Sequence, residues 1–370
     1  MNHKFDIVIV NCFETYENRV CLLKKVFEDE GKTVRVITSD YCHMHKKART
    51  DFPDDFEAIH VRPYRKNLSV DRLLSHYRFA ETAMKRVAEI HPQLVWILVP
   101  PNSLVKFAAK FKEQYPDSKL VFDMIDMWPE TMPISQFKTL FPFTIWKNLR
   151  DRHLQSADVV VTECDLYQSV LDKCYRGRIY TLYLAWEGTP VAANPNPPRD
   201  RIALCYLGSI NNIVDISAIC SVISSINQPV EFHIIGDGEK RDELICQAEA
   251  AGAQVIYHGK IYDKQQKQVI FDHCHMGINF MKDSVFVGLS MKSIDYFEAG
   301  LPVLNNIKGD TWRLVEEEQV GLNYDRSSIT CEQILEIQAY RSNVRESFNM
   351  HFTESVFRDK VKEILLQVEG

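Results

Sequence analysis

Short runs of β-branched and other apolar residues alternate with longer amphipathic segments along the whole chain of 370 residues. Runs that are apolar at every position are typical of strands buried on both faces of a parallel sheet, with the amphipathic segments as crossover helices. In the first half we expect strands at 5–10, 33–38, 58–61, 94–99, 119–122, 158–162 and 179–184. The rhythm then restarts, with strands expected at 202–206, 231–235, 254–257, 276–280 and 302–304. The pattern predicts an α/β chain with two Rossmann-like, doubly wound parallel sheets.

A proline-rich stretch separates the two halves. Residues 188–200 hold four prolines and little that is apolar, which is the composition of an exposed connector. We therefore place a first domain at 1–187, a linker at 188–200 and a second domain at 201–350. The remaining segment, 351–370, carries an amphipathic helical pattern that suits packing against either domain, the first included. Two such domains are expected to face a cleft, since doubly wound folds bind ligands beside the carboxyl ends of their strands.

The composition excludes several classes of protein. The 44 basic and 50 acidic residues give a net charge of −6, which argues against a nucleic-acid partner. No run approaches the roughly 18 apolar residues of a membrane-spanning helix, and the first residues lack the pattern of a signal peptide. The ten cysteines have scattered spacings without a CxxC pair, so we expect reduced thiols. These features predict a cytoplasmic protein.

Two glycine-containing turns follow predicted strands of the second half. Gly208 and Ser209 come directly after the strand at 202–206, and such a small-residue turn lets backbone N–H groups approach an anion. A plain turn is the alternative. The GDG turn at 236–238 lacks the third glycine of a dinucleotide fingerprint and the acid about 20 residues later, so we interpret it as a tight turn rather than an NAD site.

The most informative stretch lies between the last two predicted strands. Gly288, Leu289 and Ser290 form a loop that opens a helix, Lys292 lies in the first turns of that helix, and Asp295 follows three residues later. A helix N-terminus with an ammonium group suits a diphosphate, and a nearby carboxylate suits the vicinal hydroxyls of a ribose. The stretch therefore predicts a site for a nucleotide sugar.

In order and spacing, these motifs resemble those of the retaining glycosyltransferases of GT-B fold, in particular glycosyltransferase family 4 and its relatives in polysaccharide assembly. The similarity covers essentially the whole second domain. Its segments are YLGS at 206–209, IIGDGEKRDEL at 234–244, YHGKI at 257–261, GLSMKSIDYFEAGLPVL at 288–304 and VGLNY at 320–324. In the first domain the resemblance depends mainly on FDMIDMWPE at 122–130.

The resemblance implies a sugar-donor site in the second domain and an acceptor site in the first. By position, the residues that would contact the donor are Gly208, Ser209, Lys260, Ile261, Gly288, Leu289, Ser290, Lys292 and Asp295. The two glycine loops would meet the diphosphate, and Lys292 would add positive charge. Asp295 would bind the ribose hydroxyls, while Lys260 and Ile261 would border the base.

The chain departs from the family pattern at several positions. Asp295 stands where the family usually has glutamate, and Val287 and Ile125 stand where many members have a glutamate and a histidine. Asparagines at 211–212 replace the arginine or lysine often found after the Gly-Ser turn. Lys292 is therefore the cation that the motifs place nearest the phosphates.

In the first domain we expect Asp126 to lie nearest the reacting centre, where it would orient an acceptor or donor hydroxyl. An acid that caps the turn before Trp128 is the alternative. Asp123 alternates to the other face of its strand. No D-x-D pair accompanies the strand signals, so we expect no metal at the diphosphate. Residues 273–275 (HCH) are interpreted as core positions rather than zinc ligands, because neighbours in sequence point in different directions.

The resemblance implies an EC 2.4 enzyme, a hexosyl- or N-acetylhexosaminyltransferase that acts with retention and without a metal or other cofactor. The expected sugar donor is a nucleotide sugar carried by uridine diphosphate (UDP), and the acceptor a hydroxyl of a glycan or lipid-linked molecule. Two alternatives stay open: a catalytically inactive GT-B-fold subunit that binds a partner or acceptor, and an epimerase or hydrolase on the same scaffold. Residues 137–153, aromatic on one side and basic on another, suit either ordinary helix packing or peripheral contact with the inner face of a membrane.

Overall fold

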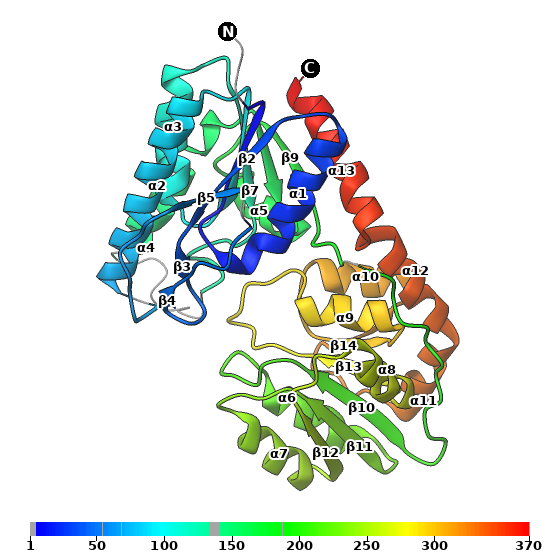
Figure 1. Ribbon diagram of the computed structural model, residues 1–370. Coiled ribbons are helices and arrows are strands. Elements are labelled where there is room, and N and C mark those ends of the chain that lie inside the picture. Colours follow the sequence, from blue (N-terminus) through cyan, green and yellow to red (C-terminus); the bar gives the residue numbers. More distant parts are fainter. Residues whose placement is uncertain are drawn as a thin grey trace. The chain divides into compact units, whose positions relative to one another are not determined.

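The computed structural model describes residues 5–53, 55–67, 69–132, 141, 143–186 and 188–369. The chain divides into two compact units (Figure 1). Unit 1 consists of Met1–Ala185 together with Glu354–Gly370, and unit 2 of Trp186–Thr353. Each unit is built around one parallel β-sheet, which confirms the predicted fold class.

Unit 1 contains a seven-stranded parallel sheet in the order β5-β2-β1-β6-β7-β8-β9. Its strands are β1 (Ile7–Val10), β2 (Val34–Ser39), β5 (Phe56–Ile59), β6 (Leu94–Val99), β7 (Lys119–Met124), β8 (Val159–Thr162) and β9 (Arg178–Thr181). The central strands β1 and β6 are buried at every position, as expected for a sheet covered on both faces. A short antiparallel pair, β3 (Tyr41–Cys42) and β4 (Lys47–Ala48), lies outside this sheet.

The helices of unit 1 are α1 (Glu17–Asp29), α2 (Val70–Ile90), α3 (Ser103–Gln114), α4 (Phe143–Asp151), α5 (Asp165–Leu171) and α13 (Glu354–Glu369), with 3-10 turns η1 (Glu14–Tyr16) and η2 (Leu154–Ser156). Helix α13 comes from the C-terminal end of the chain and packs beside α1 (Figure 1). Its Phe357 and Ile364 share the apolar core with Phe27 of α1. The last helix therefore belongs to the first unit.

A buried ion pair crosses the core of unit 1. The guanidinium of Arg19 on α1 donates to both carboxylate oxygens of Asp123 on β7, at 2.9 and 2.8 Å, and both side chains are almost fully buried. The indole N–H of Trp96 on β6 donates to the same carboxylate at 3.0 Å. These hydrogen bonds satisfy the buried charges, so Asp123 joins a helix and two strands in the interior.

Unit 2 contains a six-stranded parallel sheet in the order β12-β11-β10-β13-β14-β15. Its strands are β10 (Ile202–Leu207), β11 (Val230–Ile235), β12 (Ala253–Gly259), β13 (Met276–Asn279), β14 (Val303–Asn305) and β15 (Gly321–Asn323). The order changes direction between β10 and β13, which are neighbours in the sheet although two strands lie between them in the sequence. In doubly wound folds this switch point is where ligands bind.

The helices of unit 2 are α6 (Ile216–Ser225), α7 (Arg241–Ala250), α8 (Lys264–His273), α9 (Met291–Ala299), α10 (Asp310–Glu318), α11 (Cys331–Glu336) and α12 (Arg341–His351), with the 3-10 turn η3 (Ile337–Tyr340). Helices α6, α7 and α11 share one core cluster with alternate residues of β10 and β11. Helix α8 contacts α9 and β10, and α9 contacts β13 and α12. In the described part of the chain, no helix is both long enough and apolar enough to span a membrane.

Candidate functional site

The predicted donor-binding residues of unit 2 follow the carboxyl ends of its strands. Gly208 and Ser209 follow β10, Lys260 and Ile261 follow β12, and the loop after β13 leads to the start of α9. Because all the strands are parallel, these segments meet at one edge of the sheet. This is the edge at which a doubly wound sheet binds its ligand.

The loops after β10 and β11 approach each other through two glycines. Gly208 N–H donates to the Ile235 carbonyl at 2.9 Å, and a Cβ on Gly236 would lie only 2.0 Å from the Gly208 carbonyl oxygen. Both glycines have positive φ, 114° for Gly208 and 143° for Gly236. Gly236 therefore lacks a side chain because backbone atoms occupy the space, which explains the GDG turn without a dinucleotide.

Lys292 reaches from α9 to the end of β10. Its Nζ lies 3.1 Å from the phenolic oxygen of Tyr206 and 4.2 Å from the centroid of that ring. The Tyr206 hydroxyl in turn donates to the Ser209 carbonyl at 2.9 Å. The helix, the strand and the Gly-Ser turn are thus joined through one tyrosine, which brings together three of the predicted residues: Gly208, Ser209 and Lys292.

The ammonium group of Lys292 has no carboxylate partner in the described part of the chain. Burial lowers the pKa of Lys292 from 10.5 to about 7. A half-buried cation without an acid beside it is costly to maintain, and an anionic ligand at this edge would supply the missing charge. Lys292 therefore has the electrostatic properties of a phosphate-binding residue.

Ser290 begins helix α9 as its N-cap. Its hydroxyl accepts from Ser293 N–H at 3.3 Å and donates to the Asn279 side chain at 2.8 Å. The Gly288 carbonyl accepts from the Thr311 backbone and hydroxyl. Gly288, Leu289 and Ser290 are all buried, and the Gly288 carbonyl and the Ser290 hydroxyl hold the helix start in place. The Ser293 N–H is capped by Ser290, so the N–H groups at the very start of α9 are what this loop can offer to an anion.

Asp295 and Lys260 make contacts of their own. The Asp295 carboxylate pairs with Lys267 of α8 at 3.2 Å, and burial raises the pKa of Asp295 against the lowering effect of that lysine. Lys260 is exposed, with its Nζ 3.9 Å from the Asp237 carboxylate, and Ile261 is half-buried. Asp295 thus lies against α8, while Lys292 on the same helix lies against β10.

In unit 1, Asp126 follows β7 and accepts two hydrogen bonds from its own turn. The Trp128 indole N–H donates to one carboxylate oxygen at 2.5 Å, and the Thr131 hydroxyl donates to the other. Burial raises the pKa of Asp126, although these hydrogen bonds act in the opposite direction. This is the arrangement of an acid that caps a turn, and a role of Asp126 near a reacting centre stays a prediction.

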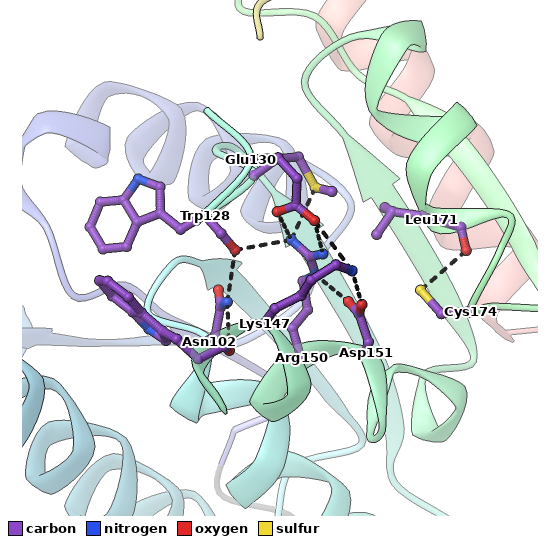
Figure 2. A network of polar contacts seen from close by, with 10 residues as sticks. Asn102, Trp128, Glu130, Lys147, Arg150, Asp151, Leu171 and Cys174 are labelled. Atoms are coloured by element: carbon purple, nitrogen blue, oxygen red, sulfur yellow. Dashed lines mark hydrogen bonds and ion pairs between the residues drawn. The ribbon is translucent and has the colours of Figure 1, made fainter. Parts of the chain in front are cut away.

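The chain at Trp128 and Glu130, just after Asp126, is held by the buried side chains of Arg150 on α4 and of Asn102, the residue before α3 (Figure 2). Arg150 of α4 donates to both oxygens of Glu130, at 2.8 and 3.0 Å, and to the Trp128 carbonyl at 3.1 Å. Asn102 donates to the same carbonyl at 2.9 Å. Trp146 and Arg150 are thus packed inside unit 1, whereas residues 137–140 and 142 of the segment considered for membrane contact lie outside the described residues.

Sequence reasoning missed a group of aromatic and basic side chains near this turn. The Phe13 ring contacts His76 and Trp128, with centroids 5.2 and 5.6 Å apart. The Arg72 guanidinium lies 4.5 Å from the Trp128 ring centroid and donates to the Asn67 carbonyl at 2.7 Å. Burial lowers the pKa of both Arg72 and His76. In the sequence these two residues look like ordinary positions of the long helix α2.

Comparison with known proteins identifies the fold. No family model matches the sequence, and no curated protein sequence matches it. Solved structures do match over nearly the whole chain: sucrose-phosphate synthase from Thermosynechococcus elongatus has a TM-score of 0.67 at 14% identity and covers 98% of both chains. The chain has the GT-B fold.

Two further structures of similar fold have descriptions that mention UDP or a UDP-sugar. Anabaena HepE in complex with UDP-glucose has a TM-score of 0.62 at 14% identity, and covers 98% of this chain and 99% of its own. An α,α-trehalose-phosphate synthase (UDP-forming) from Burkholderia vietnamiensis has a TM-score of 0.63 at 10% identity and covers 100% of both chains. At these identities the similarity establishes the GT-B fold that the sequence predicts.

Proposed function

We propose that this GT-B chain is a glycosyltransferase that moves a sugar, with retention, from a UDP-sugar to a hydroxyl of a glycan or lipid-linked acceptor. The observation that carries the proposal is the Lys292 ammonium, half-buried beside Tyr206 at the switch point of the second sheet and without a carboxylate partner among the described residues. Structures of the same fold include one in complex with UDP-glucose and a UDP-forming synthase.

In this proposal the chain itself neutralises the leaving diphosphate, without a metal ion. Lys292 and the first-turn amides of α9 would bind its oxygens, and the loop at Gly208 and Ser209 would approach it closely. These groups stabilise the negative charge that develops when the bond between the anomeric carbon and the phosphate oxygen breaks. Asp295 would bind the ribose, and Lys260 and Ile261 would border the uracil.

Retention then follows from attack on the same face of the sugar. The acceptor oxygen forms its bond to the anomeric carbon as the phosphate leaves, and the acceptor proton passes to the departing phosphate oxygen. The protein contributes mainly alignment and charge stabilisation in such a reaction. We propose Asp126 of unit 1 as the side chain that orients a hydroxyl.

The proposal is tested by thermal shift and calorimetry of the intact protein with UDP, GDP, ADP, UDP-glucose and UDP-N-acetylglucosamine. We expect UDP and at least one UDP-sugar to raise the melting temperature, because a ligand that binds only the folded state stabilises it. EDTA should leave this shift unchanged. If no nucleotide binds, the proposed transferase is wrong and an inactive GT-B subunit is favoured. If a UDP-sugar is consumed at the same rate without an acceptor, a hydrolase or epimerase is favoured.

A further inference from the structure

A second group of polar side chains lies in unit 2, on elements that do not carry the proposed sugar-donor residues Lys292 and Gly208. Glu231 and His233 are two residues apart on β11, so their side chains project from the same face of the sheet. His273 is the last residue of α8. One ligand atom from each of the three lies within 4.8 Å of the other two.

His233 is the unusual member of this group. Its side chain is more than nine-tenths buried, and its Nε2 has no hydrogen-bond partner within the described residues. A Glu231 carboxylate oxygen lies 3.7 Å from this nitrogen, beyond hydrogen-bond distance. A buried nitrogen of this kind calls for a ligand, since an unsatisfied polar atom in the interior is unfavourable.

The other nitrogen of His233 is already paired. Its Nδ1 lies 3.0 Å from Nε2 of His258 on β12, and the two rings are almost parallel, at 12° with centroids 5.2 Å apart. When Nδ1–H donates to His258, the Nε2 of His233 carries a free lone pair directed toward Glu231. Histidines that bind metals are usually held by a hydrogen bond of this kind from the second ring nitrogen.

The Glu231 carboxylate is also held by a hydrogen bond from a neighbouring side chain. Arg201 donates to one of its carboxylate oxygens at 2.8 Å, and the other oxygen lies 2.9 Å from the His273 Nε2. Ligand atoms in a tetrahedral zinc site are about 3.3 Å apart, given metal–ligand distances of about 2.0–2.1 Å. The separations of 2.9 and 3.7 Å from the shared Glu231 oxygen lie on either side of this value, and the two histidine nitrogens lie within 4.8 Å of each other.

We propose that Glu231, His233 and His273 bind a Zn²⁺ ion, with water in the fourth position. Two imidazole nitrogens and one carboxylate oxygen form a ligand set that zinc commonly uses. The His273 side chain is 43% exposed, which gives the ion access from solvent. Because the ligands come from β11 and from the end of α8, the ion would join a strand to a helix that packs on the same sheet through β10.

The test uses the full-length protein and ZnCl₂ alone, followed by calorimetry and by metal analysis after dialysis at pH 7. We expect one Zn²⁺ per chain and a rise in melting temperature on binding. The variants His273→Ala and Glu231→Gln should each weaken binding by roughly tenfold or more, as loss of a ligand or its support does. The matched control is His60→Ala in unit 1, whose side chain is 84% exposed, and it should bind zinc like the wild type.

Cobalt provides a second measurement that does not depend on stability. Co²⁺ added to the apo-protein should give visible absorption bands of a four-coordinate site, and Zn²⁺ should displace it. The proposal is overturned if no stoichiometric zinc uptake occurs, or if uptake is unchanged in both His273→Ala and Glu231→Gln. In either case the three residues form only an ion-pair network with Arg201.

Discussion

Lys292 and Tyr206, which are 86 positions apart in the sequence, meet with Nζ 3.1 Å from the phenolic oxygen and 4.2 Å from the ring centroid. The contact orients the ammonium by a hydrogen bond and by the face of an aromatic ring, neither of which neutralises its charge. A carboxylate in place of the tyrosine would neutralise the ammonium charge and would compete with a phosphate for it. The pair therefore positions a cation that is still available to an anion.

Replacing Lys292 by alanine is expected to weaken UDP binding by roughly ten- to a hundredfold. A hydrogen bond to a charged group contributes about 1.5–3 kcal/mol, and this cation is the one that we place on the diphosphate. Calorimetry of the variant and the wild type with UDP measures the change. The matched control is Lys85→Ala in unit 1, an exposed lysine paired with Glu81, which should bind UDP normally. Equal affinities of wild type and Lys292→Ala would contradict the assignment.

The same lysine has a predictable effect on stability. Burial lowers the pKa of Lys292 from its ordinary value of 10.5 to about 7 in the folded protein. Folding is therefore less favourable when this lysine is charged. The resulting penalty is complete below about pH 7 and disappears as the pH rises toward 10.5. Lys292→Met should therefore raise the melting temperature more at pH 6 than at pH 9. If Lys292→Met binds no UDP but has a higher melting temperature than the wild type, the loss of binding is due to a lost ligand contact and not to unfolding.

UDP affinity of the wild type is expected to fall as the pH rises above neutrality. Since the pKa of Lys292 is about 7, the free protein loses this cation over the next units of pH, and binding of a diphosphate must then be accompanied by proton uptake. The affinity should fall by up to about tenfold per pH unit, which calorimetry in buffers of different ionisation enthalpy can resolve. Lys292→Arg remains charged at these pH values, so its affinity should be nearly independent of pH. The same slope in both proteins would rule out Lys292 as the titrating group.

The two sheets could be predicted because buried parallel strands are apolar at every position, a pattern that sequence alone displays. The short strand β15 (Gly321–Asn323) was not predicted, because three residues are too few to show a hydrophobic pattern. It is a strand because it pairs with β14. The helix start at Lys292 was recognisable from its glycine loop, which is a local feature. The fold is therefore well specified by local pattern.

The contacts of the site residues were not predictable, because they depend on how elements far apart in sequence pack. Tyr206 belongs to an apolar strand and gives no polar signal, yet its hydroxyl connects Lys292 to the Ser209 carbonyl. The Lys267 partner of Asp295 comes from another helix. Of the three residues at 273–275 that were interpreted as core positions, Cys274 and His275 are buried, but the His273 side chain is 43% exposed and meets Glu231 through the packing of α8 on the sheet.

Replacing Gly236 by alanine is expected to unfold or strongly destabilise unit 2 and to abolish UDP binding. Its Cβ would lie 2.0 Å from the Gly208 carbonyl oxygen, so the two loops at the proposed site would have to separate. Gly252 offers a matched control in the same unit, because it also has positive φ (101°) but nothing within 4 Å of a Cβ. Gly252→Ala should carry only the conformational penalty of about 1 kcal/mol. Chemical denaturation of both variants measures the difference, and equal losses would mean that loop contact is unimportant.

Replacing Asp123 by alanine is expected to destabilise unit 1 by about 3–5 kcal/mol, because the buried Arg19 guanidinium would lose its partner. Denaturant unfolding followed by tryptophan fluorescence is a direct measurement, since Trp96 donates to the same carboxylate. The double variant Arg19→Met, Asp123→Leu should recover much of the loss by removing both charges. A single variant as stable as wild type would show that the ion pair makes no net contribution.

Replacing Asp126 by asparagine is expected to lower turnover by about tenfold or more while leaving UDP affinity unchanged, because we place this residue on a hydroxyl and not on the nucleotide. The asparagine keeps the size of the side chain but has one carbonyl oxygen for the two donors, Trp128 and Thr131. Thr131→Val tests the turn itself, since it removes one of these donors and leaves the carboxylate. If Asp126→Asn and Thr131→Val reduce stability to the same degree and neither changes turnover per folded molecule, Asp126 only caps the turn. If turnover falls in Asp126→Asn but not in Thr131→Val, the Asp126 carboxylate itself takes part in the reaction.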